Sequence, residues 1–116
     1  MVDLHGGPSS AVSQVPRDDT AYVHRDALLK YQFYDPVFGG TYPANGFAFM
    51  NGWVDAVRTA MNTTTFGMYL NYADTSLSAS EAHSAYWLEH YDRLATIKRK
   101  YDPAQLFSNP QAVLRT

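Results

Sequence analysis

Three side chains with different chemistry lie within six positions of one aromatic stretch in the middle of the chain. Tyr69 offers a phenol, Asn71 an amide and Asp74 a carboxylate. If the stretch begins as an extended strand, Tyr69 and Asn71 lie on the same face. Leu70 and Tyr72 then lie on the opposite face. A phenol beside an amide can hydrogen-bond a ring carbonyl or take a proton.

The same residues also fit a structural interpretation. A strand end could pack its two tyrosines, and Asp74 could turn the chain. The residue types alone favour this interpretation over catalysis.

Two other groups of polar side chains offer weaker candidates. His83 and His90 stand seven positions apart on one expected helix face, and two histidines are too few for a metal site. We therefore expect no metal, and histidines that lie at the surface or cap a helix. His24 and Arg25 could bind an acidic substrate, but we favour a strand pair in which Arg25 is bridged to a nearby carboxylate.

Composition limits the function classes. The 116 residues suffice for one domain, with 46% apolar and 15% aromatic residues. The net charge of −2 gives no electrostatic reason to expect nucleic acid or an anionic membrane as partner. The absence of cysteine excludes disulfides and thiolate sites. No apolar run approaches membrane-spanning length, and no leader pattern precedes the first turn, so we expect a soluble, cytoplasmic protein.

The N-terminal third predicts short strands. Residues 1–8 are expected to form a loop because they contain Gly6-Gly7-Pro8. Residues 11–15 alternate weakly between two prolines and predict a strand. A second strand is expected over 28–34, with a helix beginning near Asp26 as its rival.

Two segments predict helices. Residues 45–62 carry an apolar stripe that we interpret as core, with Asn45 as N-cap. The stripe comprises Phe49, Met50, Trp53, Val54, Val57 and Met61. Residues 77–101 form a second helical region, which Ser78 and Glu81 open as a capping box. The fold class is α+β, a small antiparallel sheet packed against two or three helices. Leu106 and Phe107 are expected to dock on an apolar surface.

The order of residues in the second half of the chain is specific. It reads Tyr69-x-Asn71-Tyr72-x-Asp74, Tyr86-Trp87, Tyr91-x-Arg93-Leu94, Ile97-Lys98-x-Lys100-Tyr101-Asp102-Pro103, Leu106-Phe107 and Pro110-Gln111. This order closely resembles the C-terminal segment of the berberine bridge enzyme-like FAD-linked oxidases, of the vanillyl-alcohol oxidase superfamily. Earlier residues, from Gly6-Gly7 to His24-Arg25, resemble the strand pair that precedes the helix in that family.

The resemblance implies a single domain, residues 1–116, that lacks the N-terminal FAD-binding domain of such oxidases. It places Asn71 near the flavin and Tyr69 or Tyr72 near the substrate, where a tyrosine acts as a base in some relatives. A phenol has a pKa of about 10, so it needs a neighbouring cation or hydrogen bonds to work near neutrality. The sequence names no such partner.

A piece of a substrate domain should expose apolar surface, which usually marks an interface. Our first hypothesis is the substrate-domain part of an FAD-linked oxidoreductase that acts on an alcohol, a sugar or a natural product. FAD would be present if a flavin-binding domain completes the chain, and the isolated chain could hold none. The alternatives are a flavin-free homodimer that binds, cyclises or isomerises a hydrophobic natural-product intermediate, and a non-catalytic partner subunit. The expected partners are a small-molecule substrate and either a second copy or a separate flavin-binding chain. Whether the chain is itself an enzyme stays open at this point.

Overall fold

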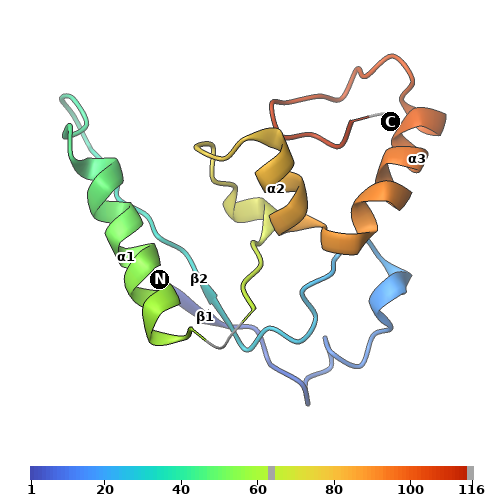
Figure 1. Ribbon diagram of the computed structural model, residues 1–116, viewed down its shortest axis with the longest axis horizontal. Helices are drawn as coiled ribbons and strands as arrows, with labels where there is room; N and C mark the ends of the chain where they lie inside the picture. The colour runs from blue at the N-terminus through green and yellow to red at the C-terminus, as the bar shows by residue number, and fades with distance from the viewer. Residues whose placement is uncertain (63–64, 115–116) are drawn as a thin grey trace.

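Two three-residue strands near the N-terminus pair with each other in the computed structural model, which describes residues 1–62 and 65–114. The strands run antiparallel, with Asp3 opposite Lys30. They lie between one long helix and a pair of packed helices (Figure 1). In chain order the elements are β1 (Val2–Leu4), η1 (Arg17–Asp19), β2 (Leu29–Tyr31), α1 (Gly46–Ala60), η2 (Leu70–Tyr72), α2 (Ala79–Tyr86), η3 (Leu88–His90) and α3 (Tyr91–Tyr101), where η marks a single 3-10 turn.

The predicted α+β class is confirmed, but the strands differ from the prediction. The strand expected over 28–34 shortens to β2, and its partner β1 comes from the segment expected to be a loop. Residues 11–15 form turns instead of a strand. The Ser13 hydroxyl lies within donating distance of the carbonyl oxygens of Pro8 and Ser10. Local hydrogen bonds of this kind compete with the hydrogen bonds that would pair this segment with another strand.

The core lies between α2 and α3. Ala82, Tyr86 and Trp87 are buried there, with Leu94 and Val113 packed against them. The predicted capping box is present, because Ser78 and Glu81 bond each other's backbone N–H groups. The single helical region that was expected is broken after Tyr86, where Leu88 adopts a left-handed φ of 46°. This break turns α3 away from α2.

Arg25 is buried, and its partners differ from the expected carboxylates. Its guanidinium donates to the Thr20 hydroxyl at 2.6 Å and approaches the Val12 carbonyl at 3.5 Å. The side chain therefore fastens the turns of the N-terminal third together and is not available to an acidic substrate.

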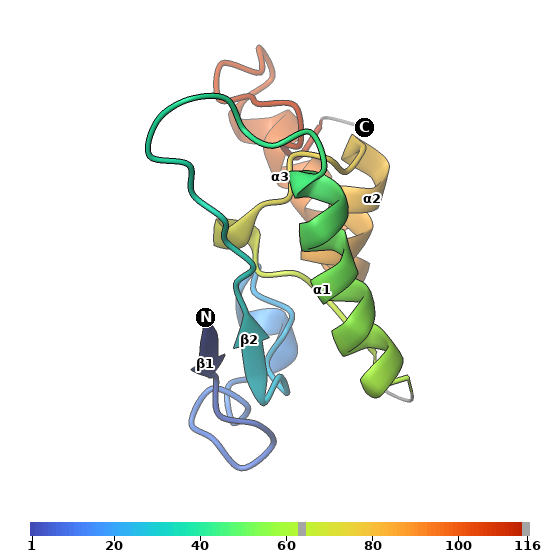
Figure 2. The ribbon, with the colours of Figure 1, turned by 90° about the vertical axis from the view of Figure 1, so that its left-hand side faces the viewer.

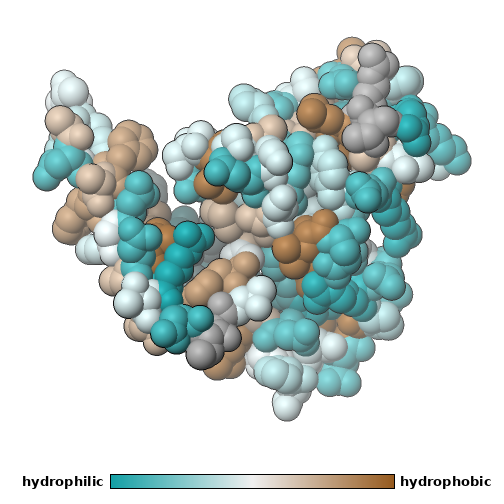
Figure 3. Space-filling model, viewed as in Figure 1, coloured by the Kyte–Doolittle hydropathy of each residue, from teal (hydrophilic) through white to brown (hydrophobic). Residues whose placement is uncertain are grey.

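Helix α1 stands apart from the other helices, and the chain between β2 and α1 arches away before it enters the helix (Figures 1 and 2). Met50, Val54, Val57 and Met61 are half-buried at helical spacing. Phe49 and Trp53 belong to the same predicted stripe, yet they are 55% and 50% exposed and pack on each other. Hydrophobic atoms gather over this part of the molecule, and a notch separates it from the rest (Figure 3). Four of the six residues of the predicted core stripe are therefore half-buried, two are exposed, and none belongs to the buried core.

The molecule is open for its size. Its accessible surface is 8313 Å², about 2,000 Å² more than the ~6,300 Å² typical of a monomer of this mass. Its radius of gyration is 16.4 Å, against about 13 Å for a compact domain of this length. Leu106 and Phe107, which were expected to dock, are 81% and 80% exposed. None of the described helices is both long and apolar enough to cross a membrane.

Candidate functional site

The stretch around Tyr69 brings its phenols and its amide together, by a geometry that differs from the expected one. Tyr69 is extended, with φ −80° and ψ 118°, and the backbone then closes into the 3-10 turn η2. This turn brings Tyr72 to the side of Tyr69, so that the two rings meet edge to face with centroids 5.2 Å apart. Asn71 Nδ2 donates to the Tyr69 phenol oxygen at 2.8 Å. The expected alternation of faces is wrong because residues 65–69 form no strand and the chain enters the turn η2 directly after Tyr69.

Asp74 lies outside this cluster. Its Oδ1 accepts from the backbone N–H and the hydroxyl of Ser76, at 2.9 and 2.6 Å. The carboxylate thus turns the chain, as in the structural interpretation.

The paired strands supply two side chains that sequence reasoning missed. The Tyr72 hydroxyl donates to Asp3 Oδ2 at 3.2 Å, and the Lys30 ammonium lies over the Tyr69 ring at 4.3 Å from its centroid. Asp3 and Lys30 are opposite each other in the antiparallel ladder, so both reach the same face of the sheet. A carboxylate and a cation therefore face the two tyrosines.

A second layer of rings supports Tyr69 from behind. The Tyr22 hydroxyl lies 2.7 Å from His5 Nε2, and the Tyr22 ring meets Tyr69 edge to face. Burial lowers the pKa of His5, and the nearby charge of Lys30 lowers it further. A neutral His5 can accept a hydrogen bond from the Tyr22 hydroxyl, and this bond fixes the orientation of the Tyr22 ring.

His24 anchors the start of the stretch that carries the site. Its Nε2 lies 3.1 Å from the carbonyl oxygen of Tyr86, and burial lowers the pKa of the ring. Gly67 passes so close to this ring that any side chain at position 67 would overlap it. The glycine is needed here for close approach and not for an unusual φ.

The electrostatics of the Tyr72–Asp3 pair decide where its proton rests. Partial burial raises the pKa of Tyr72, and the Asp3 charge and hydrogen bond raise it further. Tyr72 therefore holds its proton at neutral pH and directs it at Asp3 Oδ2. When the Tyr72 oxygen receives a proton from a neighbour, the hydroxyl can pass its own proton along the hydrogen bond to Asp3.

The two candidate histidines of the second half are buried, and neither side chain caps a helix, so the expectation of surface or helix-capping histidines is wrong. His83 stacks on Tyr91 at 4.3 Å, and its Nε2 lies 2.9 Å from the carbonyl oxygen of Ala112. His90 Nδ1 lies 3.4 Å from the carbonyl oxygen of Ala21. Among the residues that the structure describes, no group of three or more His, Cys, Asp or Glu side chains could hold a metal ion.

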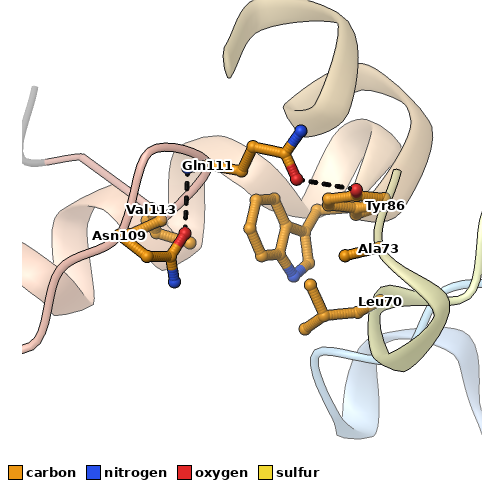
Figure 4. A pocket seen from close by; sticks show the side chains of 8 residues that line it. Leu70, Ala73, Tyr86, Asn109, Gln111 and Val113 are labelled. Carbon is orange, nitrogen blue, oxygen red and sulfur yellow. Dashed lines mark hydrogen bonds between the residues drawn. The ribbon is translucent and has the colours of Figure 1, made fainter. Parts of the chain in front are cut away.

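A pocket of about 340 Å³ lies behind η2, where the C-terminal tail crosses α2 (Figure 4). Leu70 and Ala73 form its wall on the side of the site. Gln111 fastens the tail, because its amide accepts from the Tyr86 hydroxyl at 2.9 Å and donates to the carbonyls of Asp74 and Leu77. These bonds hold η2 against the core, and the site on its outer side is thereby fixed in position.

The second half of the chain matches a known family. Residues 68–114 match the family model described as "Berberine and berberine like". Residues 68–114 thus carry a berberine-like segment. This match begins one residue before Tyr69, so it contains η2 and the pocket, whereas Asp3 and Lys30 lie outside it.

Individual proteins are similar to nearly the full length of this chain. A xylooligosaccharide oxidase of Thermothelomyces thermophilus is 45% identical over 97% of this chain and 23% of its own length. An FAD-linked oxidoreductase of Metarhizium anisopliae is 44% identical over 95% of this chain and 22% of its own length. The solved structure of a chitooligosaccharide oxidase superposes with a TM-score of 0.85 at 39% identity, over 99% of this chain and 25% of that one. The chain thus spans about a quarter of the length of the relatives it matches.

Proposed function

We propose that this chain is the C-terminal, substrate-domain part of an FAD-linked oxidoreductase that oxidises a hydroxyl group of an oligosaccharide. The observation that carries the proposal is the hydrogen-bonded pair of Tyr72 and Asp3 beside Tyr69 and Asn71. Support for the substrate class comes from two of the similar proteins, which are named as oxidases of xylo- and chitooligosaccharides.

The chemistry of the pair suits this reaction. Oxidation of a hydroxyl to a carbonyl removes a proton from oxygen and a hydride from carbon. The Tyr72 phenol oxygen can receive the proton as its own proton passes to Asp3, which avoids a free phenolate whose formation the raised pKa of Tyr72 disfavours. Tyr69 accepts its hydrogen bond from Asn71, so its own O–H remains able to donate to a substrate oxygen.

Asn71 fits a place beside a flavin. Its side chain is exposed, and apart from the N–H given to Tyr69 it keeps one donor and one acceptor for a neighbour. The edge of a flavin ring presents alternating carbonyl and N–H groups, which an amide can match. FAD bound there would supply the acceptor for the hydride.

The open surface fits a large partner. The excess of about 2,000 Å² in accessible surface exceeds the ~800 Å² that each partner buries in a standard interface, and it is typical of obligate association. We propose that the flavin-binding part of the oxidase covers it, on the same polypeptide or on a separate chain. Within residues 1–62 and 65–114 no feature favours the flavin-free homodimer, the partner subunit or the natural-product substrate over this assignment.

The test compares Tyr72→Phe with Tyr34→Phe in the native complex. Tyr34 is exposed, so its variant controls for the loss of a hydroxyl alone. We expect a yellow complex that oxidises oligosaccharides, a loss in kcat of about 10²–10⁴-fold for Tyr72→Phe, and little change for Tyr34→Phe. Turnover that survives in Tyr72→Phe would remove the catalytic role, and a complex without flavin absorbance would remove the oxidase assignment.

A further inference from the structure

Lys30 reaches the site because of the register between the two strands. Asp3 and Lys30 are direct partners in the ladder, so their side chains leave the sheet on the same face. Asp3 meets Tyr72, and Lys30 meets Tyr69. The sheet thus presents one anion and one cation, each against one tyrosine of η2.

The ammonium of Lys30 has a different environment from that of the other two lysines. Lys98 is paired with the Asp102 carboxylate, and Lys100 lies over the ring of Tyr101 at the exposed end of α3. Lys30 is half-buried, and in the described part of the chain its ammonium makes no ion pair or hydrogen bond besides its contact with the Tyr69 ring. Its charge is therefore not neutralised by a direct partner.

This charge lies within reach of the proton-accepting pair. The Lys30 ammonium is 4.3 Å from the Tyr69 centroid, which is 5.2 Å from the Tyr72 centroid. The ammonium is thus at most the sum of the two, about 9.5 Å, from the Tyr72 ring. Its influence already extends to a neighbour, because it contributes to the lowered pKa of His5.

Besides Lys30 and Asp3, the groups around the site include one further charge, that of Arg25. The titratable and charged side chains that face this cluster come from β1 and its continuation, from β2, from residues 22–25 and from η2. They are Asp3, His5, Tyr22, His24, Arg25, Lys30, Tyr69 and Tyr72. The Arg25 guanidinium lies over the Tyr22 ring at 5.8 Å from its centroid, and its charge stays the same when Lys30 is replaced. Burial lowers the pKa of both histidines and raises that of Tyr22 and Tyr72, which keeps these four groups uncharged near neutral pH.

We propose that Lys30 is a positioning residue for the oxidation, the cation that keeps the Tyr72–Asp3 pair ready to accept a proton. This inference rests on the proposed function. In the step, the substrate O–H bond breaks and its proton joins the Tyr72 oxygen, while the Tyr72 proton moves to Asp3. The pair changes from one negative charge to none. A nearby positive charge stabilises the charged, proton-accepting form and so keeps the site active at lower pH.

The size of the effect follows from the distance. The Lys30 ammonium lies no more than about 9.5 Å from the centre of the Tyr72 ring, whose hydroxyl contacts the Asp3 carboxylate. Two unit charges on the order of 10 Å apart, at an effective dielectric constant of about 20, interact strongly enough to move a titration by about one pH unit. Loss of the Lys30 charge should therefore move the acid limb of the pH profile of kcat/KM upward by about one unit. The limb reports proton uptake by the pair in the free enzyme.

The experiment uses the complete oxidase and three variants. Lys30→Met removes the charge and keeps an apolar stem, Lys30→Arg restores the charge, and Lys100→Met removes the other lysine that lies on a tyrosine ring. We expect the upward shift in Lys30→Met alone, with KM on the alkaline plateau changed less than about threefold. An acid limb that stays in place in Lys30→Met, or a loss confined to KM at every pH, overturns the inference. If Lys30→Met does not fold, Lys30→Gln takes its place, and an acid limb that stays in place in Lys30→Gln also overturns the inference.

A second readout separates this inference from the proposed function. Aspartate labelled with ¹³C at the carboxyl group reports the protonation of the pair by NMR, with the Asp3 signal assigned through its loss in Asp3→Asn. We expect the midpoint of proton uptake to rise in Lys30→Met and to stay in place in Lys100→Met. A shift of this midpoint in a complex that oxidises no oligosaccharide supports the effect of Lys30 and removes the proposed reaction. An unshifted midpoint in an active complex removes the inference and leaves the reaction standing.

Discussion

Gly67 offers a direct test of how the site is attached to the core. A Cβ at this position would fall well inside van der Waals contact with Cε1 and Nδ1 of His24. The ring has little freedom to move away, because its Nε2 lies 3.1 Å from the carbonyl oxygen of the buried Tyr86. Gly67→Ala must therefore displace either His24 or the backbone that leads into η2.

The expected cost combines two effects. Overpacking in a well-filled region costs about 1–3 kcal/mol, and loss of the His24 hydrogen bond adds about 0.5–1.5 kcal/mol. We expect Gly67→Ala to lower the free energy of unfolding by about 2–4 kcal/mol. Denaturation in urea, followed by circular dichroism in the protein with its native partner, measures this difference.

Gly52→Ala is the matched control. It adds the same methyl group in the middle of α1, where the new Cβ has no atom within 4 Å apart from the neighbouring residues and backbone of the helix itself. It should stabilise the helix by about 0.5–1 kcal/mol, because alanine loses less backbone entropy than glycine. If Gly67→Ala also proved neutral or stabilising, the close packing of His24 on this stretch would be refuted.

Two further predictions concern the core and the N-terminal turns. Tyr86→Phe should cost about 1–3 kcal/mol in urea denaturation, because it leaves the backbone N–H of Asp74 and the amide oxygen of Gln111 without their partner; an unchanged midpoint would contradict the role of this network. Arg17 holds the pKa of Glu89 at about 2, mainly by its hydrogen bond. Because this value lies below the ordinary one near 4.5, the contribution of Glu89 is complete above pH ~4.5 and is lost as the pH falls toward 2. Glu89→Gln should flatten the thermal stability profile across that range, and a profile as steep as that of the parent would count against the pair.

The helices could be predicted because their signals are local. The capping box of Ser78 and Glu81 lies within four residues, and the apolar spacing of residues 45–62 repeats every three or four positions. The break at Leu88 could not be predicted, since no proline or glycine marks it. It lies beside the turn η3, whose Glu89 and His90 contact Arg17 and the carbonyl oxygen of Ala21 in the N-terminal third.

The strands and half of the site could not be predicted, because they depend on contacts between distant residues. Three-residue strands carry too few positions for an alternating pattern, and their pairing is decided by the ladder between residues 2–4 and 29–31. Tyr69, Asn71 and Tyr72 were recognisable from one short stretch. Their partners Asp3 and Lys30 lie about 40–70 positions earlier in the sequence. Only the folded structure shows that the Asp3 carboxylate contacts Tyr72 and that the Lys30 cation contacts Tyr69.

The apolar stripe of α1 shows why sequence cannot separate a core from an interface. Both need large apolar residues at helical spacing, and only the structure shows that Val54 is half-buried while Trp53 is exposed.

Whether a partner covers the exposed surface also affects the electrostatics of the site. In water, the attraction between a lysine and a tyrosine–carboxylate pair is strongly screened, and it grows several-fold when a partner excludes water. A partner that covers the open side of this molecule and the site would therefore also strengthen the electrostatics of Lys30, Asp3 and Tyr72, so the same association would serve stability and proton transfer.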